Sequence, residues 1–517
     1  MTGAAPVHES ERVRADADVV GLARGGGLNL AGALFTQAAF FVINLLLART
    51  LGQDAVGIYA QAFALLALLE LLSLSGFRAG LTRFVAIHVA DRDPAALRGT
   101  VRLGLAIVAS SSTLIGVAVI LAAPWLADVA FDDPAMLGPL RVIGLSLPAA
   151  SLAEAALSAT QGFRTMRYFA GVRYFLVPGT RVFLTAVAVL SGLGLEGAMT
   201  ALLASSVAGA FAALVALRRL LPRSTTPARY EARELFRFSA ISWMSSIAST
   251  GLLWADTVLL GIFLPSAEVG VYQIASRLVL LATLAATSIN ASFAPRIADL
   301  WRRGRLDSLE RSYVAAASWI LRLSLPVFVA LVVMPRELLV IFGSGFTIGA
   351  SVTVILVVGM ATDSATGPCG LMLNHTGRVA LNMVDNIGVL IANVLLNLYL
   401  IPRYGIEGAA VGWTISLVAV NLARLGQVRA TMGMLPFGRA SLKGLVAATS
   451  AGTVAAFVQS VLDGSLVVPV VACVIAVVYF GTLLALGISA EDRLVVGHLF
   501  TRSRQEAALR TAPAQGS

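Results

Sequence analysis

The chain contains 517 residues, of which 58% are hydrophobic and only 13% are charged. A soluble globular protein usually carries about 25% charged residues, so this composition excludes a protein with an ordinary water-facing surface. The net charge of +10 does not indicate a nucleic-acid partner, because the basic residues are spread over many short segments beside apolar runs. The composition predicts an all-α polytopic membrane protein, in which apolar stretches of about 20 residues cross the bilayer as helices.

Fourteen apolar runs follow one another along the chain, each bounded by charged residues or by Pro and Gly. As helices, runs of this length match the roughly 30 Å hydrocarbon core of a bilayer. The sequence therefore predicts about 14 transmembrane helices. In chain order, the predicted spans are 28–48, 57–77, 100–122, 139–160, 169–190, 195–217, 239–263, 270–290, 312–334, 351–372, 379–400, 406–427, 441–461 and 466–487.

The distribution of basic residues predicts the orientation of these helices. If the N-terminus is cytoplasmic, the even-numbered connections and the two tails hold most of the 38 Lys and Arg residues. Such a bias is typical of cytoplasmic segments, where basic loops also lie close to anionic lipid headgroups. Residues 1–27 hold several charges and lack the short apolar core of a cleavable signal. We therefore expect a multi-pass protein of the plasma membrane with both termini in the cytoplasm.

Two short phrases occur twice, which indicates an internal duplication. VGIYAQA (56–62) matches VGVYQIA (269–275), and GLEGA (194–198) matches GIEGA (405–409), with nearly the same separation. Glycine at these positions allows a sharp chain reversal or a close helix approach. Six helices per copy give both copies the same orientation, and parallel repeats of this kind are a transporter design. The predicted divisions are a cytoplasmic tail (1–27), an N-lobe (28–217), a basic cytoplasmic connection (218–238), a C-lobe (239–428), two appended helices (429–487) and a cytoplasmic tail (488–517).

Two longer stretches carry a family resemblance. WADTVLLGIFLPSAEVGVYQIASRL (254–278) and LIPRYGIEGAAVGWTISL (400–417) closely resemble the polysaccharide-flippase branch of the multidrug/oligosaccharidyl-lipid/polysaccharide (MOP) exporter superfamily. The resemblance covers essentially the whole chain. It implies two six-helix bundles around a V-shaped central cavity that opens to one side at a time. It also implies flipping of an undecaprenyl-diphosphate-linked oligosaccharide from the cytoplasmic to the outer leaflet by alternating access.

Arginines in or near the predicted spans are the candidates for binding the diphosphate, because arginine stays ionised and presents forked donors to phosphate oxygens. Arg277 is the foremost candidate, since the eighth helix supplies a basic cavity residue in the lipid-linked precursor flippases that this chain resembles. Arg78, Arg83 and Arg24 either capture the diphosphate at the cytoplasmic entrance or anchor helix ends. The other candidates, within the fifth and ninth spans, are Arg181 and Arg322.

Acidic side chains within the predicted spans are candidates for coupling transport to H⁺ or Na⁺, because a charge buried in hydrocarbon is costly and is commonly functional. Some of these acids are instead expected to form structural pairs with the arginines, and Glu154 lies in a span as well. The coupling candidates are Glu70, Asp256, Asp363 and Asp385.

The eleventh span carries a polar face. Asn382, Asn386, Asn393 and Asn397 are spaced so that they lie on one side of a helix. Four amides on one face predict contact with another helix or with a wet cavity. Asn386, Asn393 and Asn397 are therefore candidates for binding sugar hydroxyls, and hydrogen bonding between helices is the alternative interpretation.

No catalytic or metal-binding motif is found in the sequence. GSGF (343–346) lacks a P-loop lysine, the chain has no Walker A or HExxH pattern, and Cys369 and Cys473 lie within apolar spans. We expect neither a cofactor nor a metal nor an enzymatic activity. The expected partners are a lipid-linked oligosaccharide, membrane lipids, and the polymerase and glycosyltransferases that handle the same glycan. The alternatives are a cation-coupled multidrug antiporter of the same superfamily, or a membrane-embedded glycosyltransferase or scaffold of polysaccharide assembly.

Overall fold

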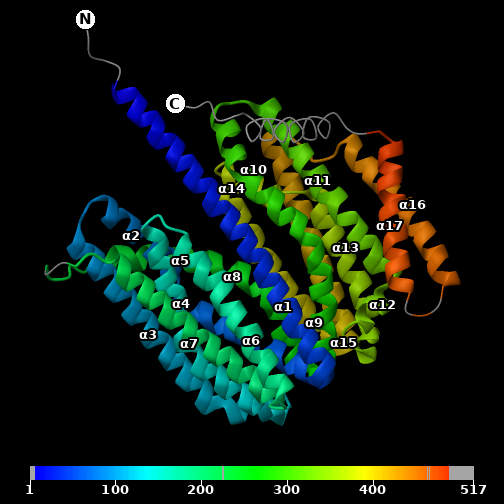
Figure 1. The fold of residues 1–517 in the computed structure, drawn as a ribbon, viewed down its shortest axis with the longest axis horizontal. Coiled ribbons are helices and arrows are strands. Elements are labelled where there is room, and N and C mark those ends of the chain that lie inside the picture. The colour runs from blue at the N-terminus through cyan, green and yellow to red at the C-terminus, as the bar shows by residue number, and fades with distance from the viewer. Residues whose placement is uncertain (1–5, 224–225, 463, 465, 488–517) are drawn as a thin grey trace, which may run out of the picture. The chain divides into compact units, whose positions relative to one another are not determined.

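The structure is a computed structural model that describes residues 6–223, 226–462, 464 and 466–487. Side chains are described from residue 31 onward, except at 245, 248, 249 and 252. Within these residues every regular element is a helix (Figure 1), so the predicted all-α class is confirmed. The predicted C-terminal tail (488–517) lies outside the described residues.

The helices divide into two compact units that do not follow the two predicted lobes. The first unit contains residues up to 278 together with 338–356 and 380–420. It holds α1 (Pro6–Leu74), α2 (Phe77–Ala90), α3 (Pro94–Trp125), α4 (Leu137–Gly162), α5 (Arg167–Ala170), α6 (Val177–Leu190), α7 (Gly194–Leu220), α8 (Ala232–Phe263), most of α9 (Ser266–Leu280), and parts of α12 (Pro335–Val340), α13 (Ala350–Thr366) and α15 (Val379–Met432). Its helices α2, α3, α4 and α7 share one apolar core, which includes Phe77, Leu81, Val101 and Leu157.

The second unit contains residues 279–337, 357–379 and the described residues after 420. Its helices are α10 (Leu284–Arg302), α11 (Leu306–Val333), α14 (Cys369–His375), α16 (Arg439–Val461) and α17 (Val467–Ala485), with the remaining parts of α12, α13 and α15. The predicted appended helices correspond to α16 and α17, which pack against each other and against α11. Buried Leu321, Leu325 and Tyr479 fill this contact.

Eleven segments of the described chain are long and apolar enough to cross a membrane, so the protein is a multi-pass membrane protein, whereas the predicted number of fourteen is not confirmed. Two segments, Ala31–Leu74 and Val379–Met432, each cover two predicted spans. They contain a non-helical residue, Gly52 and Gly405 respectively, at the point where two helices run together. The predicted seventh span contributes a shorter apolar helix, Leu253–Phe263.

The repeated GxEGA phrase has the same backbone geometry in both copies. The first glycine has a φ of 58° at Gly194 and 59° at Gly405. Residues with a Cβ rarely adopt this left-handed conformation, which explains why the phrase begins with glycine. Glu196 lies in the first turn of α7, where the helix dipole favours an acid. Glu407 accepts a hydrogen bond of 2.5 Å from the Ser351 hydroxyl, so both glutamates have a local structural role.

The repeated VGxY phrase brings its two copies into direct contact with each other. A Cβ at Gly57 would lie 1.7 Å from the carbonyl oxygen of Ser266, and a Cβ at Gly270 would lie 2.2 Å from the carbonyl oxygen of Gln53. Each would also lie 3.0 Å from the backbone nitrogen of the other glycine. Gln53 and Ser266 each precede their own glycine by four residues. The contact is therefore reciprocal, as expected of two repeats related by a twofold axis.

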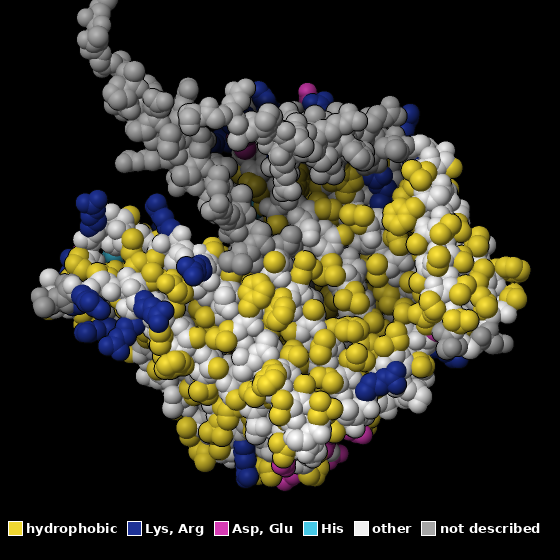
Figure 2. All heavy atoms as spheres, in the orientation of Figure 1, with side chains coloured by type: hydrophobic (Ala, Val, Ile, Leu, Met, Phe, Trp, Pro, Cys, Tyr) yellow, Lys and Arg dark blue, Asp and Glu magenta, His cyan; other side chains and the backbone are white. Residues whose placement is uncertain are grey.

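The outer surface is largely apolar, as a protein in a bilayer requires. Hydrophobic side chains cover most of the described surface on the face seen in Figure 2. On this face, Lys and Arg gather at the edge near α2 and α5, and Asp and Glu are seen at the lower edge. Exposed large apolar residues such as Leu121, Leu190 and Phe211 follow the same pattern, because lipid takes the place of water around them.

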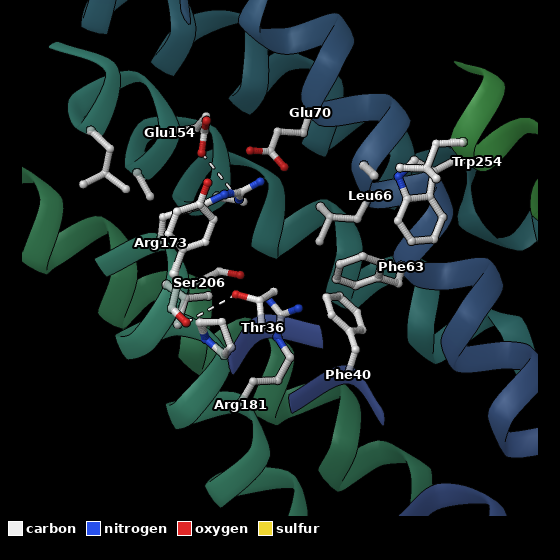
Figure 3. A pocket seen from close by; sticks show the side chains of 18 residues that line it. Thr36, Phe40, Phe63, Leu66, Glu70, Glu154, Arg173, Arg181, Ser206 and Trp254 are labelled. Atoms are coloured by element: carbon white, nitrogen blue, oxygen red, sulfur yellow. Dashed lines mark hydrogen bonds and ion pairs between the residues drawn. The ribbon is translucent and has the colours of Figure 1, made fainter. Parts of the chain in front are cut away.

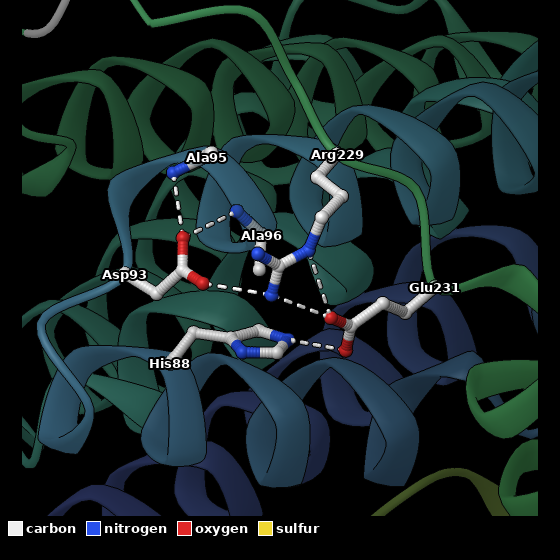
Figure 4. Close-up of polar contacts among 6 residues, drawn as sticks. All are labelled: His88, Asp93, Ala95, Ala96, Arg229 and Glu231. Atoms are coloured by element: carbon white, nitrogen blue, oxygen red, sulfur yellow. Dashed lines mark hydrogen bonds and ion pairs between the residues drawn. The ribbon is translucent and has the colours of Figure 1, made fainter.

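A polar cluster fastens the basic connection after α7 to the start of α3 (Figure 4). The guanidinium of Arg229 contacts the carboxylates of Asp93 and Glu231, with Nη2 to oxygen distances of 2.8 Å in both cases. The second carboxylate oxygen of Glu231 lies 3.8 Å from Nε2 of His88. Hydrogen bonding from the backbone N–H of Ala96 lowers the pKa of Asp93 below its usual range, and the charge of Arg229 adds to this effect. The connection therefore has a defined anchor on the first unit.

Candidate functional site

Two adjoining cavities, of about 300 and 280 Å³, lie within the first unit. Their walls come from α1, α2, α4, α6, α7, α8 and the short π-helical segment η3 (Gly171–Leu176) that precedes α6. The two cavities share part of their lining, so they lie side by side. The shared residues are Ala67, Glu70, Glu154, Arg173, Leu253 and Trp254.

Glu154 binds two arginines at the junction of the cavities. Its Oε1 lies 3.0 Å from Nε of Arg78, and its Oε2 lies 3.4 Å from Nη1 of Arg173. The Glu154 side chain is only 4% exposed, whereas those of Arg78 and Arg173 are 56% and 45% exposed. Burial of an unpaired carboxylate would be strongly unfavourable, so the two arginines make the position of Glu154 possible. The guanidinium groups still face open space.

Glu70 and Arg181 complete the charged lining. Figure 3 shows Glu70 beside Glu154 and Arg173 at one end of the cavity, and Arg181 at the other end. Arg181 donates to the Ser205 hydroxyl at 3.1 Å, and its guanidinium carbon lies 5.2 Å from the ring centroid of Phe63. Among the described residues, Glu70 has no ion pair within 4 Å. Three arginines and two glutamates line the two cavities, so positive charge is in excess.

The π-helical segment η3 places Arg173 and Tyr174 at the cavity wall. Pro178 has no backbone N–H to donate to the carbonyl of Tyr174, so a regular α-helical hydrogen bond cannot form there. The hydroxyl of Thr36 on α1 lies 3.3 Å from this carbonyl oxygen and 2.9 Å from that of Gly32, so its single proton is shared between the two acceptors. A π turn contains one residue more than an α turn, and this changes which side chains face the cavity. The proline thus helps to determine the direction of Arg173.

An aromatic wall faces these charges. The ring centroid of Phe63 lies 5.0 Å from that of Phe40 and 5.3 Å from that of Trp254. Arg277 on α9 adjoins this wall, with its guanidinium carbon 5.5 Å from the Phe40 centroid and 5.2 Å from the Trp254 centroid. Its Nε and Nη2 lie 2.9 and 3.1 Å from the Gln273 amide, in the orientation where the amide oxygen accepts both hydrogen bonds. Arg277 therefore contacts residues that line the cavity, without lining it itself.

A second polar cluster in the first unit surrounds Asp256. The carboxylate accepts a hydrogen bond of 2.6 Å from the Asn397 amide and one of 3.4 Å from the Tyr272 hydroxyl. Asn397 also donates to the side-chain oxygen of Asn393 at 3.2 Å. All four residues are buried, and the two asparagines have no exposed surface. Asn397 thus forms a hydrogen bond between α15 and α8, and the assignment of Asn393 and Asn397 to sugar binding stays a prediction.

The other predicted site residues are placed outside these cavities. The guanidinium carbon of Arg83 lies 4.5 Å from the ring centroid of Phe238. In the second unit, Arg322 donates to the carbonyl of Ser318, and Asp363 accepts from Asn421.

Three predicted residues remain on α15 and α1. Asp385 and Asn386 are half-buried on α15. Arg24 lies in the part of α1 whose side chains are outside the described residues. Of the arginines predicted to bind substrate, the structure places Arg78 and Arg181 in the cavities, together with the acidic coupling candidate Glu70.

Arg173 is absent from the residues predicted above, although it joins the site. It lies near the start of the predicted fifth span, where a basic residue normally anchors a helix end. One signal could have revealed it, because Arg173 and Arg181 are eight residues apart and Pro178 lies between them in an apolar run. The aromatic residues of the wall give no such signal, since apolar side chains fill every span.

Comparison with known proteins identifies the family. The sequence profile described as "Polysaccharide biosynthesis protein" matches residues 22–301, more than half of the chain, and the MatE profile matches residues 242–399. A curated relative from Haloferax volcanii, "Probable low-salt glycan biosynthesis flippase Agl15", is 29% identical over 234 residues. That match covers 45% of this chain and 49% of the relative, so the chain spans about half the length of the relative that it matches.

Two solved structures share the fold. "Lipid II flippase MurJ, inward closed conformation" has a TM-score of 0.71 at 12% identity, covering 87% of this chain and 97% of that one. An inward-facing multidrug resistance MATE family transporter of the MOP superfamily has a TM-score of 0.59 at 15% identity, covering 77% and 94%. At these identities the likeness establishes the fold alone. The profile match over more than half of the chain shows that the chain belongs to the polysaccharide biosynthesis protein family.

Proposed function

We propose that the protein is a flippase that moves a lipid-linked oligosaccharide from the cytoplasmic to the outer leaflet of the plasma membrane. The observation that carries this proposal is the cavity of the first unit, where three arginines and two glutamates line a space within a multi-pass membrane protein. Charged side chains inside a membrane protein are energetically costly, so they commonly have a function. An excess of arginine favours an anionic ligand. Membership of the polysaccharide biosynthesis protein family supports a glycan as the cargo.

The proposed substrate is an undecaprenyl-diphosphate-linked repeat unit. Its diphosphate is the charged group that must pass the apolar middle of the membrane, while its prenyl tail can remain in lipid. Arg78, Arg173 and Arg181 offer charge-assisted donors to phosphate oxygens. The aromatic wall of Phe40, Phe63 and Trp254 provides apolar surface opposite these donors, which suits the faces of sugar rings. Alternating access would expose this space to each leaflet in turn.

The orientation of the protein follows from its basic connections. We propose that both termini are cytoplasmic, because the connection after α7 and the connection between α2 and α3 carry arginines such as Arg92, Arg223 and Arg229. In this orientation Arg78, in the first turn of α2, lies toward the cytoplasmic side of the cavity. A headgroup would then meet Arg78 before it reached Arg181.

Ion coupling is a further part of the proposal, because no nucleotide-binding motif is present in the sequence. The coupling candidates are Glu70, Asp256, Asp363 and Asp385. Glu70 lines the cavity, and Asp256 is buried among neutral donors. An H⁺ or Na⁺ that neutralised one of these carboxylates would change its interactions between the two conformations. The remaining two acids lie on α13 and α15.

The second candidate function is a cation-coupled multidrug antiporter, which the MatE profile match at residues 242–399 favours. A site for cationic drugs would need an excess of acidic side chains, whereas the cavity carries an excess of arginine. A membrane-embedded glycosyltransferase or a scaffold of polysaccharide assembly is less well supported, because the named relative is a flippase.

The test is to deplete the protein from cells, extract the prenyl-linked oligosaccharides for mass spectrometry, and label each leaflet separately. The flippase proposal expects completed lipid-linked repeat units to accumulate in the cytoplasmic leaflet. Their mass would also identify the sugar and the carrier. Unchanged lipid-linked pools and unchanged surface polysaccharide would contradict the proposal and favour the antiporter, whose test is the efflux of cationic dyes.

A further inference from the structure

The two arginines at the junction of the cavities are held by one carboxylate. Arg78 begins α2, Arg173 lies in η3, and Glu154 lies in the body of α4 between them. We propose that Glu154 is a positioning residue that holds Arg78 and Arg173 as a two-armed clamp for the diphosphate of the substrate. This inference rests on the proposed function, and it identifies the feature of the lipid carrier that the cavity recognises.

Glu154 has the properties of a fixed anchor. Its side chain is 4% exposed, and it projects from the middle of α4, which packs against α2, α3 and α7. Each of its carboxylate oxygens contacts a different arginine, at 3.0 and 3.4 Å. The side chains of Arg78 and Arg173, by contrast, are about half exposed. Without Glu154, no group would hold the side chains of Arg78 and Arg173 close together. Repulsion between their positive charges would then move the two guanidinium groups apart.

The clamp retains most of its hydrogen-bonding capacity. A guanidinium group has five N–H donors in a planar fork. Among the described residues, Arg78 and Arg173 each form an ion pair with Glu154 and no side-chain hydrogen bond to another group. The remaining donors can therefore bind a ligand, and a fork–phosphate pair is commonly bidentate.

Two guanidinium groups that share one carboxylate can each bind one phosphoryl group. A diphosphate can place one phosphoryl group against each guanidinium, whereas a monophosphate can satisfy only one of them fully. The clamp should therefore favour a prenyl diphosphate over a prenyl monophosphate. Arg181, which is bound to Ser205 at the other end of the cavity, does not contribute to this distinction.

A competing explanation makes the opposite prediction. If Glu154 only neutralised nearby positive charge, replacing it by glutamine would strengthen the binding of any phosphate, because an adjacent negative charge would be lost. If it positions the arginines, the same replacement weakens binding of the diphosphate in particular. A purely structural role would lower the melting temperature without changing the preference between the two lipids.

The experiment uses the full-length protein purified into nanodiscs, with undecaprenyl diphosphate and undecaprenyl monophosphate as the probes. Dissociation constants for both lipids are measured by native mass spectrometry or fluorescence titration. Wild type is expected to prefer the diphosphate. Glu154→Gln is expected to weaken diphosphate binding about tenfold, as for the loss of one charge-assisted contact, and monophosphate binding by much less. The ratio of the two constants is the decisive quantity.

Two further variants keep the test independent of folding. Arg173→Ala, at a half-exposed side chain, should lose the diphosphate preference in the same way as Glu154→Gln. Arg102→Ala, at an exposed arginine on α3 that does not line the cavities, should retain it. A Glu154→Gln protein that kept the wild-type ratio, or bound diphosphate more tightly, would overturn the positioning role alone. A wild-type protein without preference for diphosphate would overturn both this inference and the proposed diphosphate carrier.

Discussion

The first unit contains two polar clusters that differ in how completely they are closed. Around Glu154, ionised groups of both signs line a cavity, and the arginines are half exposed. Around Asp256, a carboxylate is enclosed by neutral amides and a hydroxyl, and the asparagines have no exposed surface. Both clusters place charge inside a membrane protein. The first presents its free donors on partly exposed side chains, whereas the second has one buried amide donor, on Asn393, without a hydrogen-bond partner among the described residues.

This difference separates two uses of polar residues in a membrane protein. In a closed cluster the hydrogen bonds run between its own members, so they join helices and, where a carboxylate is present, can respond to a small cation. An open cluster with excess positive charge has charge and hydrogen-bond donors that a bound anion would satisfy. Variants in the two clusters should consequently affect different measurements, transport in one case and stability or ion dependence in the other.

The largest effect is expected in the open cluster. Arg173→Ala should reduce export of lipid-linked oligosaccharide at least tenfold, because loss of a hydrogen bond to a charged group corresponds to roughly 1.5–3 kcal/mol. Export is measured by leaflet-specific labelling, and membrane levels are measured by immunoblotting. Arg102→Ala is the matched control. Normal export by Arg173→Ala would place this arginine among the helix-end anchors and would remove the contrast between the clusters.

In the closed cluster, the main effect should be on stability. Asn397→Ala removes the 2.6 Å hydrogen bond to the buried carboxylate of Asp256. The loss should destabilise the protein by about 1.5–3 kcal/mol, seen as a lower melting temperature in detergent. Export per folded molecule should change little. A stable Asn397→Ala protein that fails to export would indicate that the amide meets substrate after all.

Arg277 lies between the two cases, since it contacts the cavity wall from outside. Arg277→Ala should reduce export by about twofold to thirtyfold, because cation–π contacts of this kind contribute about 0.5–2 kcal/mol and would be lost from Phe40 and Trp254. Export by the variant and by wild type is measured in cells that contain equal amounts of the two proteins, at several such amounts. Complete loss of export would mean that Arg277 binds the headgroup directly in another conformation.

Asp256→Asn tests whether the closed cluster responds to ions. The asparagine side chain has nearly the same size and keeps an oxygen that can accept from Asn397, so the fold should be preserved. If Asp256 carries the coupling ion, the variant should export slowly and lose its dependence on external pH or Na⁺. Export is followed between pH 5.5 and 8, conditions chosen to span the physiological range. An unchanged profile would remove Asp256 from the coupling candidates.

The smallest effect is expected at the polar cluster that anchors the connection after α7. The folded state lowers the pKa of Asp93, so its ionised form stabilises the fold above the unfolded pKa of about 4. That contribution is lost as the pH falls through the lower folded pKa. Asp93→Asn should therefore melt slightly lower than wild type at neutral pH, and the two melting curves should converge in acid. Parallel curves at every pH would exclude the carboxylate charge as the cause.

Much of the fold could be predicted from the sequence, because it depends on local patterns. The apolar runs predict a multi-pass helical protein, and the first glycine of each GxEGA phrase has a positive φ, as a sharp turn requires. The boundaries between the spans were harder to predict, since two helices meet at a kink at Gly52 in α1 and at Gly405 in α15, with no longer connection between them. Whether two neighbouring apolar runs form one helix or two depends on the backbone conformation of a single residue between them.

The site was less predictable, because it depends on which side chains meet. The list of buried charges correctly directs attention to Glu70, Glu154 and Arg181, which line the cavities. It cannot show that Glu154 joins Arg78 to Arg173, because these residues are far apart in the chain. The direction of Arg173 depends on the π-helical turn before Pro178, and helical periodicity assumes regular turns. Asn393 and Asn397 share a face as predicted, but periodicity does not identify what that face contacts.

The reciprocal contact of Gly57 and Gly270 has a consequence for the ancestry of the chain. A residue that touches its own counterpart in the other repeat must lie close to the axis that relates them. If the two repeats arose by duplication of one gene, the same contact would have joined two identical subunits through one glycine on each, in an isologous dimer. Fusion would then have allowed the two copies to diverge at positions away from such contacts. The lack of a side chain at both positions is a remnant of that symmetry, since a larger residue in either copy would have had to pass through the other's backbone.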